Sequence, residues 1–237
     1  MNMPERIENI AAAPALPACS ACMMQTHCFA QHLDADILLH LAQNITHRRI
    51  ARGSYLYRMG EPFDTLYFVQ EGFFKSAVLN DARQTCIVGF AMAGDVLGLD
   101  GCAYSRHNSQ AMALQDSMVC ELPFQSLLAL SFTFPSLQQS LHRLMSREIT
   151  RNQNAMLMLG SLPAEEKLLA FLQTLSQQFA ARGIAADDFD LPMSREEIAD
   201  YLGLQMETVS RAFTKLRTNG MIHVHRRRVR IDTAPAA

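Results

Sequence analysis

Residues 194–222 read SREEIADYLGLQMETVSRAFTKLRTNGMI, and this stretch decides the fold of the C-terminal part of the chain. Ser194 and Glu197 have the spacing of a capping box, which marks the start of a helix. Gly203 supplies a tight turn after that helix, and the apolar spacing beyond it predicts a second helix from about 205 to 218. Two short helices joined by a glycine turn predict a helix-turn-helix.

The second of these helices carries polar side chains near its N-terminus, where a recognition helix meets base edges in the major groove. Arg211 can bind guanine, Glu207 can accept from cytosine, and Ser210 can contact either type of base. A hairpin is expected over 221–231, with the arginine run 226–228 at its tip. Such a hairpin is a wing placed to contact phosphates, so the segment predicts DNA binding.

Charge is unevenly distributed along the chain. The formal net charge is −2, yet residues 205–230 contain seven Lys or Arg against one acidic residue. A basic segment on an acidic body is the electrostatic footprint of phosphate binding, although a solvated basic face is the plain alternative. Because the basic run coincides with the predicted helix-turn-helix and wing, binding to DNA is the favoured interpretation.

A long helix is predicted upstream, over residues 135–160. Its apolar positions recur every three or four residues, which is typical of a helix that pairs with another helix. Packing on the chain's own β domain is the alternative, but the pattern continues beyond the reach of so small a domain. We therefore expect a homodimer, in which an asparagine within the stripe favours a parallel pair. The predicted interface residues are Leu141, Met145, Ile149, Asn152 and Met156.

The region from about 50 to 122 consists of short β-branched and aromatic runs with turn residues between them, which predicts a β-sandwich or β-roll. The fold class is therefore α+β. Four parts are expected: a cysteine-containing N-terminal segment (1–31), a β-roll sensor domain (32–134), a dimerisation helix (135–160) and a winged helix-turn-helix domain (161–237).

Composition narrows the class of protein further. Of the 237 residues, 49% are hydrophobic and 19% charged, which excludes a wholly disordered chain. No stretch approaches the ~20 apolar residues of a membrane span, and Glu5 and Glu8 stand where a signal peptide carries basic residues. We expect a cytoplasmic protein with no membrane partner. In that reducing compartment six cysteines indicate metal binding, redox chemistry or buried small side chains rather than structural disulfides.

Three of the cysteines are close together in the sequence. Cys19, Cys22 and Cys28 have the spacing C-x2-C-x5-C, and three thiolates so near one another favour a metal centre. A four-sulfur site needs one more ligand, for which the remaining cysteines are the candidates: Cys86, Cys102 and Cys120. Taken alone, Cys120 is typical of a core residue, because it shares a strand face with apolar neighbours.

The chain from Cys19 to Ile231 resembles the oxygen-sensing FNR (fumarate and nitrate reduction) regulators of the cyclic-AMP receptor protein superfamily. Besides the cysteine triplet, four segments carry the resemblance: AGDVLGLDG (93–101), SQAMALQDSMVCELPF (109–124), HRLMSREI (142–149) and ETVSRAFTKLRTNGMI (207–222). The resemblance implies that the β-roll is of the cyclic-nucleotide-binding type and that Cys120 is the fourth ligand, with Cys86 and Cys102 left as core residues.

The same resemblance implies a cofactor and partners. A 4Fe-4S iron-sulfur cluster would hold the dimeric, DNA-binding form together without oxygen and be lost or converted when oxygen attacks it. Glu207, Ser210 and Arg211 match the set with which the family reads TTGAT-type half-sites of a pseudo-palindrome. RNA polymerase is the partner implied for activation.

Two positions depart from the family pattern. His27 precedes Cys28 where relatives often have an apolar residue, and Asn152 stands where an acid is known. A neutral residue at 152 removes like-charge repulsion across a two-fold axis, so we hypothesise reduced oxygen sensitivity. Cyclic-nucleotide binding is not expected, because the phosphate-binding Arg-Ser pair aligns with His107 and Asn108, which offer no permanent cation.

Other functions are weaker interpretations. The same fold could bind zinc through the four thiolates, or use them as a thiol/disulfide switch. A thiol oxidoreductase built on Cys19 and Cys22 would need a βαβ context that the sequence lacks. The histidines are scattered, and Asp100 has the character of a turn residue. We therefore predict that the chain is not an enzyme.

Overall fold

The computed structural model describes residues 28–80 and 84–232. Its N-terminal half is a β-roll of two four-stranded antiparallel sheets, ordered β1-β8-β3-β6 and β2-β7-β4-β5. The first sheet comprises β1 (Thr46–Ile50), β8 (Ser117–Pro123), β3 (Thr65–Glu71) and β6 (Val96–Leu97). The second comprises β2 (Tyr55–Tyr57), β7 (Gln110–Ala113), β4 (Phe73–Leu79) and β5 (Thr85–Met92).

The two faces of the first sheet bury different side chains, because alternate residues of a strand point to opposite sides. Tyr67, Val69 and Val119 point into the roll, where they pack with residues of the second sheet such as Phe74. Leu66, Phe68 and Leu122 point outward and are covered by helices. These are η2 (Phe29–His32), α1 (Ala35–Ala42), α2 (Phe124–Thr133) and the first half of α3 (Pro135–Ser161).

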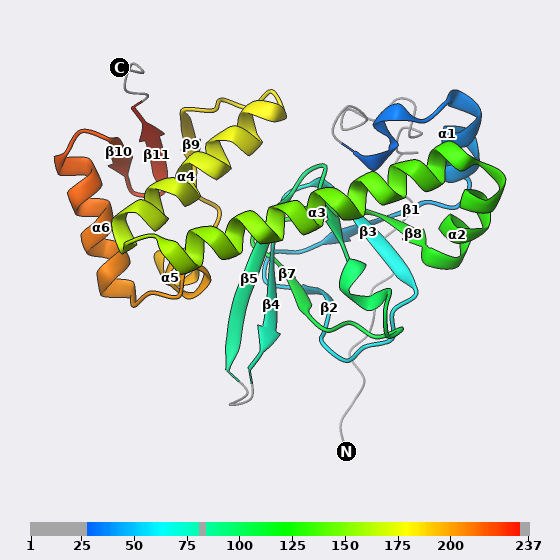
Figure 1. The fold of residues 1–237 in the computed structure, drawn as a ribbon, viewed down its shortest axis with the longest axis horizontal. Helices are drawn as coiled ribbons and strands as arrows, with labels where there is room; N and C mark the ends of the chain where they lie inside the picture. Colours follow the sequence, from blue (N-terminus) through cyan, green and yellow to red (C-terminus); the bar gives the residue numbers. More distant parts are fainter. Residues whose placement is uncertain (1–27, 81–83, 233–237) are drawn as a thin grey trace.

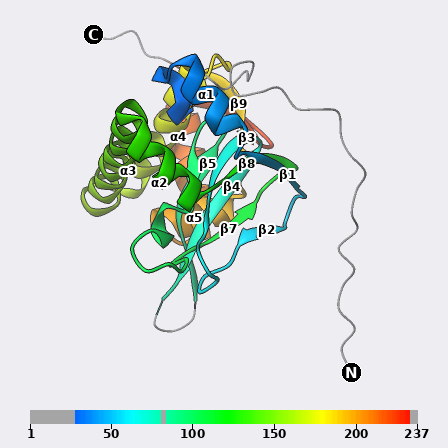
Figure 2. The ribbon, with the colours of Figure 1, turned by 90° about the vertical axis from the view of Figure 1, so that its right-hand side faces the viewer.

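Helix α3 spans the molecule and connects its two halves (Figure 1). It begins with a proline in its first turn, where the missing N–H costs nothing, and it continues for 27 residues. Its N-terminal half buries Leu137, Leu141 and Leu144, whereas the half beyond Met145 is largely exposed. Seen from the side, α3 runs beside the β-roll (Figure 2).

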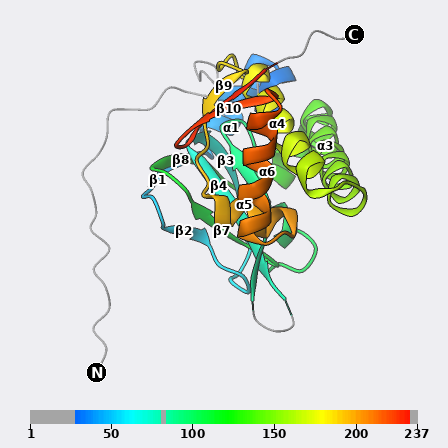
Figure 3. The same cartoon turned by 90° about the vertical axis from the view of Figure 1, so that its left-hand side faces the viewer.

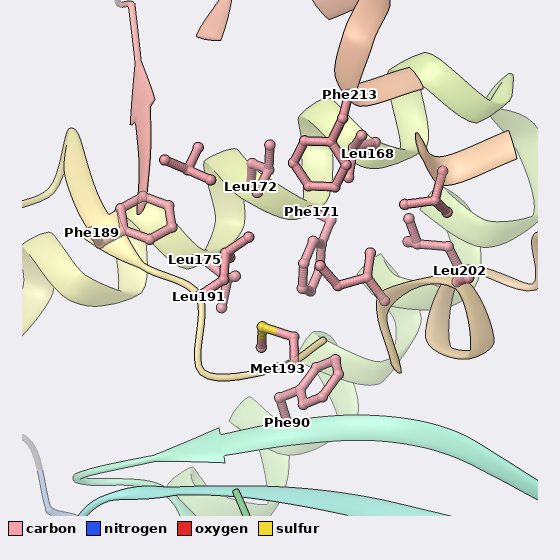
Figure 4. Packing of buried hydrophobic residues seen from close by; sticks show 14 of the residues in the cluster. Phe90, Leu168, Phe171, Leu172, Leu175, Phe189, Leu191, Met193, Leu202 and Phe213 are labelled. Carbon is pink, nitrogen blue, oxygen red and sulfur yellow. The ribbon is translucent and has the colours of Figure 1, made fainter. Parts of the chain in front are cut away.

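The C-terminal part contains a three-stranded antiparallel sheet, ordered β10-β11-β9, and three helices (Figure 3). Its elements are α4 (Ala164–Ala181), β9 (Asp188–Asp190), α5 (Arg195–Leu202), α6 (Met206–Thr218), β10 (Ile222–His225) and β11 (Arg228–Ile231). A continuous apolar cluster joins this part to the β-roll: Phe90 of β5 lies against Phe171 of α4 and close to Met193 (Figure 4).

The predicted architecture is confirmed: a β-roll, a long helix and a helix-turn-helix with a β-hairpin follow one another along the chain. Within the residues that the structure describes, no helix is long and apolar enough to cross a membrane.

Candidate nucleic-acid interface and cysteine site

The helix-turn-helix is stabilised by local interactions that the sequence predicts. The hydroxyl of Ser194 accepts from the backbone N–H of Glu197 at 3.1 Å, and the Glu197 carboxylate accepts from the Ser194 N–H at 2.7 Å. Helix α5 ends at Gly203, whose φ of 64° lies in the left-handed region that glycine adopts without strain. Helix α6 then buries Val209, Ala212, Phe213 and Leu216 against α4 and α5.

The predicted recognition residues lie on the side of α6 that faces away from this core. Glu207 and Arg211 are exposed and Ser210 is half-buried. Residues three and four apart are neighbours on a helix surface, so these three side chains form one polar face. The structure therefore brings them together at the surface, and α6 lies along the outside of the molecule (Figure 3).

The wing differs in one detail from the sequence prediction, which placed all three arginines of 226–228 at its tip. Arg226, with a φ of 58°, and Arg227 form the turn between β10 and β11 and are exposed. Arg228 is the first residue of β11, and its guanidinium forms two hydrogen bonds of 2.7 and 2.9 Å with Asp188 of β9. Arg228 thus joins two strands, and the tip carries two arginines.

Polar contacts hold the helix-turn-helix against the β-roll. Lys75 of β4 donates to Glu197 at 2.7 Å, and the backbone N–H of Ile87 in β5 donates to Asp200 at 3.1 Å. Burial favours the neutral form of Glu197, but the bonds from Lys75 and Ser194 outweigh it and lower the pKa of this carboxyl. The residue that caps α5 therefore also forms an ion pair with the sensor domain.

Cys120 lies on the outer face of the first sheet, in a row with two cross-strand partners. It is directly opposite His47 of β1 and Phe68 of β3, and its Sγ lies 3.8 Å from Oε1 of Gln70. Burial lowers the pKa of His47, so its ring favours the neutral form. Cys120 thus combines an apolar neighbour on one side with two polar groups.

Cys28 approaches the same face from the N-terminal segment. It is the residue before η2, and its side chain packs against the apolar cluster that Cys120 also contacts. The next residue, Phe29, stacks on Phe68, with ring centroids 4.4 Å apart. Two of the four predicted ligands therefore pack against the same apolar cluster, as Cys102 also does, whereas Cys19, Cys22 and His27 lie outside the described residues.

The other two cysteines have different surroundings. Cys86 lies opposite Val78 in the second sheet, away from the face that carries Cys120. Cys102 touches the outer apolar cluster, but burial and the nearby Asp100 carboxylate raise the pKa of its thiol. A raised pKa disfavours the thiolate that binds metal. Within residues 28–80 and 84–232, no group of three His, Cys, Asp or Glu could hold a metal ion.

The loop that contains His107 and Asn108, the residues aligned with the phosphate-binding pair, is held in place by a carboxylate. One oxygen of Asp100 accepts from the backbone N–H groups of Asn108 and Ser109, both at 2.8 Å, and from the Ser109 hydroxyl at 2.9 Å. A cavity of about 210 Å³ beside it is lined by Tyr57, by a second acid, Glu148, and by Arg151. Acids and a base thus share this cavity, and the absence of cyclic-nucleotide binding stays a prediction from the sequence.

The hydrogen bonds to Asp100 make stability depend on pH. Burial alone would raise the pKa of this carboxyl, but bonds from His107 and Ser109 lower it below the usual range. The ionised carboxylate therefore stabilises the fold above the ordinary pKa of an aspartate, and that contribution is lost as the pH falls through the lowered pKa.

We expect Asp100→Asn to lower the free energy of unfolding by about 2 kcal/mol near neutral pH, because the buried His107 and Ser109 lose a charged acceptor. The difference from the wild type should begin to shrink below about pH 4, the ordinary pKa of an aspartate, and should vanish only as the pH falls through the lowered pKa of the folded protein. Urea denaturation of both proteins across this range measures the effect. A difference that is constant with pH would contradict it.

The predicted dimer stripe divides into two parts on α3. Leu141 is 8% exposed and packs in the protomer's own apolar cluster. Met145, Ile149 and Met156 are 37%, 58% and 71% exposed, and Asn152 lies among them on the surface. The face available to a second chain therefore begins near Met145.

Known proteins are similar over nearly the whole chain. The Crp-like helix-turn-helix domain family matches residues 166–236, and the cyclic nucleotide-binding domain family matches residues 47–133. The chain is 40% identical over 224 residues to the transcriptional regulatory protein btr of Bordetella pertussis, covering 94% of this chain and 93% of btr. It is 38% identical over 220 residues to the fumarate and nitrate reduction regulatory protein of Escherichia coli, covering 92% and 88%.

A solved structure agrees with this relationship. FixK2 from Bradyrhizobium japonicum matches with a TM-score of 0.73 at 29% identity, covering 81% of this chain and 99% of FixK2. The sequence relatives are transcription regulators, which confirms the prediction that the chain is not an enzyme. With a cyclic-nucleotide-binding-type β-roll, a long helix and a Crp-like helix-turn-helix, the chain belongs to the Crp/Fnr family and is a DNA-binding transcription regulator.

Proposed function

We propose that this regulator is a cytoplasmic, homodimeric oxygen sensor of the FNR type. In this proposal Cys19, Cys22, Cys28 and Cys120 hold a 4Fe-4S cluster that favours the dimeric, DNA-binding state without oxygen. The observation that carries the proposal is the placement of Cys28 and Cys120 against one apolar cluster, although they are 92 positions apart in the sequence. We keep the division into a cysteine segment (1–31), sensor domain (32–134), dimerisation helix (135–160) and DNA-binding domain (161–237).

The described donors suit an iron-sulfur cluster. Thiolates are the ligands that such clusters use, and an apolar shell limits the access of water and oxygen to them. Phe29, which follows Cys28, and Phe68, which lies opposite Cys120, belong to such a shell. When bound, the cluster would supply iron and sulfide that react with oxygen.

The cysteine segment is also connected to the dimerisation helix. Helix η2 packs against α3, and Phe29 shares its apolar cluster with Leu137, Leu141 and Leu144 of that helix. Ligation of Cys28 would therefore hold η2 on the buried half of α3, while the exposed half presents Met145 and Ile149 to the partner. This route explains how the state of the cysteines biases the pairing of two chains.

The dimer would place two α6 helices in successive major grooves, which requires half-sites about one helical turn apart. We propose that Glu207, Ser210 and Arg211 read TTGAT-type half-sites of a pseudo-palindrome. The exposed polar face of α6 and the arginines of the wing tip support this assignment. RNA polymerase is the proposed partner for activation.

Anaerobic purification followed by visible spectroscopy and by iron and sulfide analysis tests the sensor. We expect broad visible absorption that air removes, with about four irons and four sulfides per chain. A colourless protein that contains zinc would favour the zinc-binding alternative. A metal-free protein whose thiols oxidise reversibly would favour the thiol/disulfide switch.

The neutral side chain of Asn152 leads to a separate prediction about oxygen sensitivity. An acid at this exposed position would place like charges across the two-fold axis, a repulsion on the order of 1 kcal/mol that the amide avoids. We therefore expect the wild type to retain a larger dimer fraction in air than Asn152→Asp. Size-exclusion chromatography with light scattering, run before and after air exposure, measures this fraction. Prompt and complete monomerisation of the wild type would contradict reduced oxygen sensitivity.

A further inference from the structure

Residues 28–31, the part of the N-terminal segment that the structure describes, contact the β-roll through an aromatic stack. Phe29 is 4% exposed, and its ring stacks on Phe68 at an interplanar angle of 19°. The adjoining Ala30 is also buried, and hydrogen bonds from Gln31 N to Cys28 O and from Leu33 N to Ala30 O fix the turn. Cys28 therefore begins a short, ordered element whose side-chain anchor is the next residue.

The partner of Phe29 determines where Cys28 lies. Phe68 is directly opposite Cys120 in the β3–β8 pair. Directly opposed residues of an antiparallel pair have Cβ atoms about 5 Å apart and point to the same face. A ring placed on Phe68 therefore brings the preceding residue, Cys28, to the row that contains Cys120.

We propose that Phe29 is a positioning residue of the cysteine site: its stack on Phe68 seats Cys28 beside Cys120 before any cluster is bound. The inference rests on the proposed function for its purpose but on described contacts for its geometry. Without this anchor, the residues around Cys28 would have to be ordered on the β-roll by ligation itself, at a cost in conformational entropy. With it, two thiols are already together.

Cross-linking of the metal-free protein tests the geometry directly. The parent chain retains Cys28 and Cys120, and serine replaces the other four cysteines, Cys19, Cys22, Cys86 and Cys102. Dibromobimane, which becomes fluorescent when it joins two neighbouring thiols, should couple Cys28 to Cys120 in this chain. Phe29→Ala should slow the coupling roughly tenfold, as expected when the seated state becomes a minor population.

Two further variants separate positioning from general loosening. Phe29→Leu retains apolar bulk over Phe68 and should restore coupling to within about threefold of the parent. Phe63→Ala removes the same side chain from the same apolar cluster, but the ring contacts of Phe63 are with Phe124 and His107. This control should leave coupling unchanged. Equal coupling in the parent and Phe29→Ala, or equal slowing in Phe63→Ala, would overturn the proposal.

Iron uptake by the chain with all its cysteines distinguishes this inference from the proposed function. If Phe29 controls coupling and Phe29→Ala also takes up iron and sulfide more slowly than Phe63→Ala during anaerobic reconstitution, both stand. If coupling depends on Phe29 but the wild type takes up no iron and sulfide, the positioning role stands and the oxygen-sensing function fails. If the wild type takes up iron but coupling does not depend on Phe29, the positioning role fails alone.

Discussion

Cys120→Ser should abolish the cluster and, with it, the anaerobic dimer. The serine oxygen is a neutral, hard donor in place of a thiolate, and three sulfurs would remain for a four-sulfur centre. We expect iron and sulfide to fall to background in the anaerobically purified variant and the visible absorption to disappear. DNA binding without oxygen should then equal that of the air-treated wild type, which electrophoretic mobility shifts under nitrogen would measure.

The remaining cysteines provide matched controls for this substitution. Cys102→Ser and Cys86→Ser make the same chemical change, one beside the same apolar cluster and one in the second sheet. Both should retain the cluster, because the pKa of Cys102 is raised by burial and Cys86 lies away from the outer face. If Cys102→Ser loses iron and Cys120→Ser retains it, Cys102 is the fourth ligand and Cys120 is a core residue. Thermal unfolding of the metal-free variants would show whether each one folds.

The fold of the DNA-binding half can be predicted from the sequence, because the residues that fix its helices and turn are close together in the chain. The capping box at Ser194 and Glu197, the glycine turn at 203 and the apolar spacing of α6 all lie within 25 residues of one another. The sequence predicts the wing tip less accurately, because the role of Arg228 depends on Asp188, which is 40 residues earlier in the chain. Contacts across a sheet are set by register, which local patterns do not encode.

The sensor half shows the same limit more strongly. Alternation along β8 predicts that Cys120 shares a face with apolar neighbours, but it does not reveal that Phe68 lies opposite or that Phe29 covers that pair. The apolar repeat of α3 likewise does not show that Leu141 belongs to the protomer's own core. The sequence predicts only a turn residue at Asp100. Its hydrogen bonds from residues 108 and 109 form because the loop closes on it.

Arg211→Ala should produce the second large effect, on sequence-specific DNA binding. Arg211 is exposed on the polar face of α6, one turn after Glu207, and a guanidinium can donate two hydrogen bonds to O6 and N7 of guanine. Its removal should cost about 1–3 kcal/mol at each half-site and relax the preference at one base pair. A dimer carries two copies, so affinity for the full site should fall by at least about thirtyfold.

Substitutions of two other arginines distinguish a lost base contact from a lost positive charge. Arg217→Ala removes the same charge from the last turn of α6, away from the predicted base contacts, and should cost less at the specific site. Arg227→Ala at the wing tip should weaken binding to all sequences alike and reduce the slope of log K against log salt by about one per lost phosphate contact. Fluorescence anisotropy on the specific site, on single-base variants and on random DNA at several salt concentrations resolves these cases. If Arg211→Ala loses affinity equally on specific and random DNA, Arg211 contacts phosphate, and base readout must rest on Glu207 and Ser210.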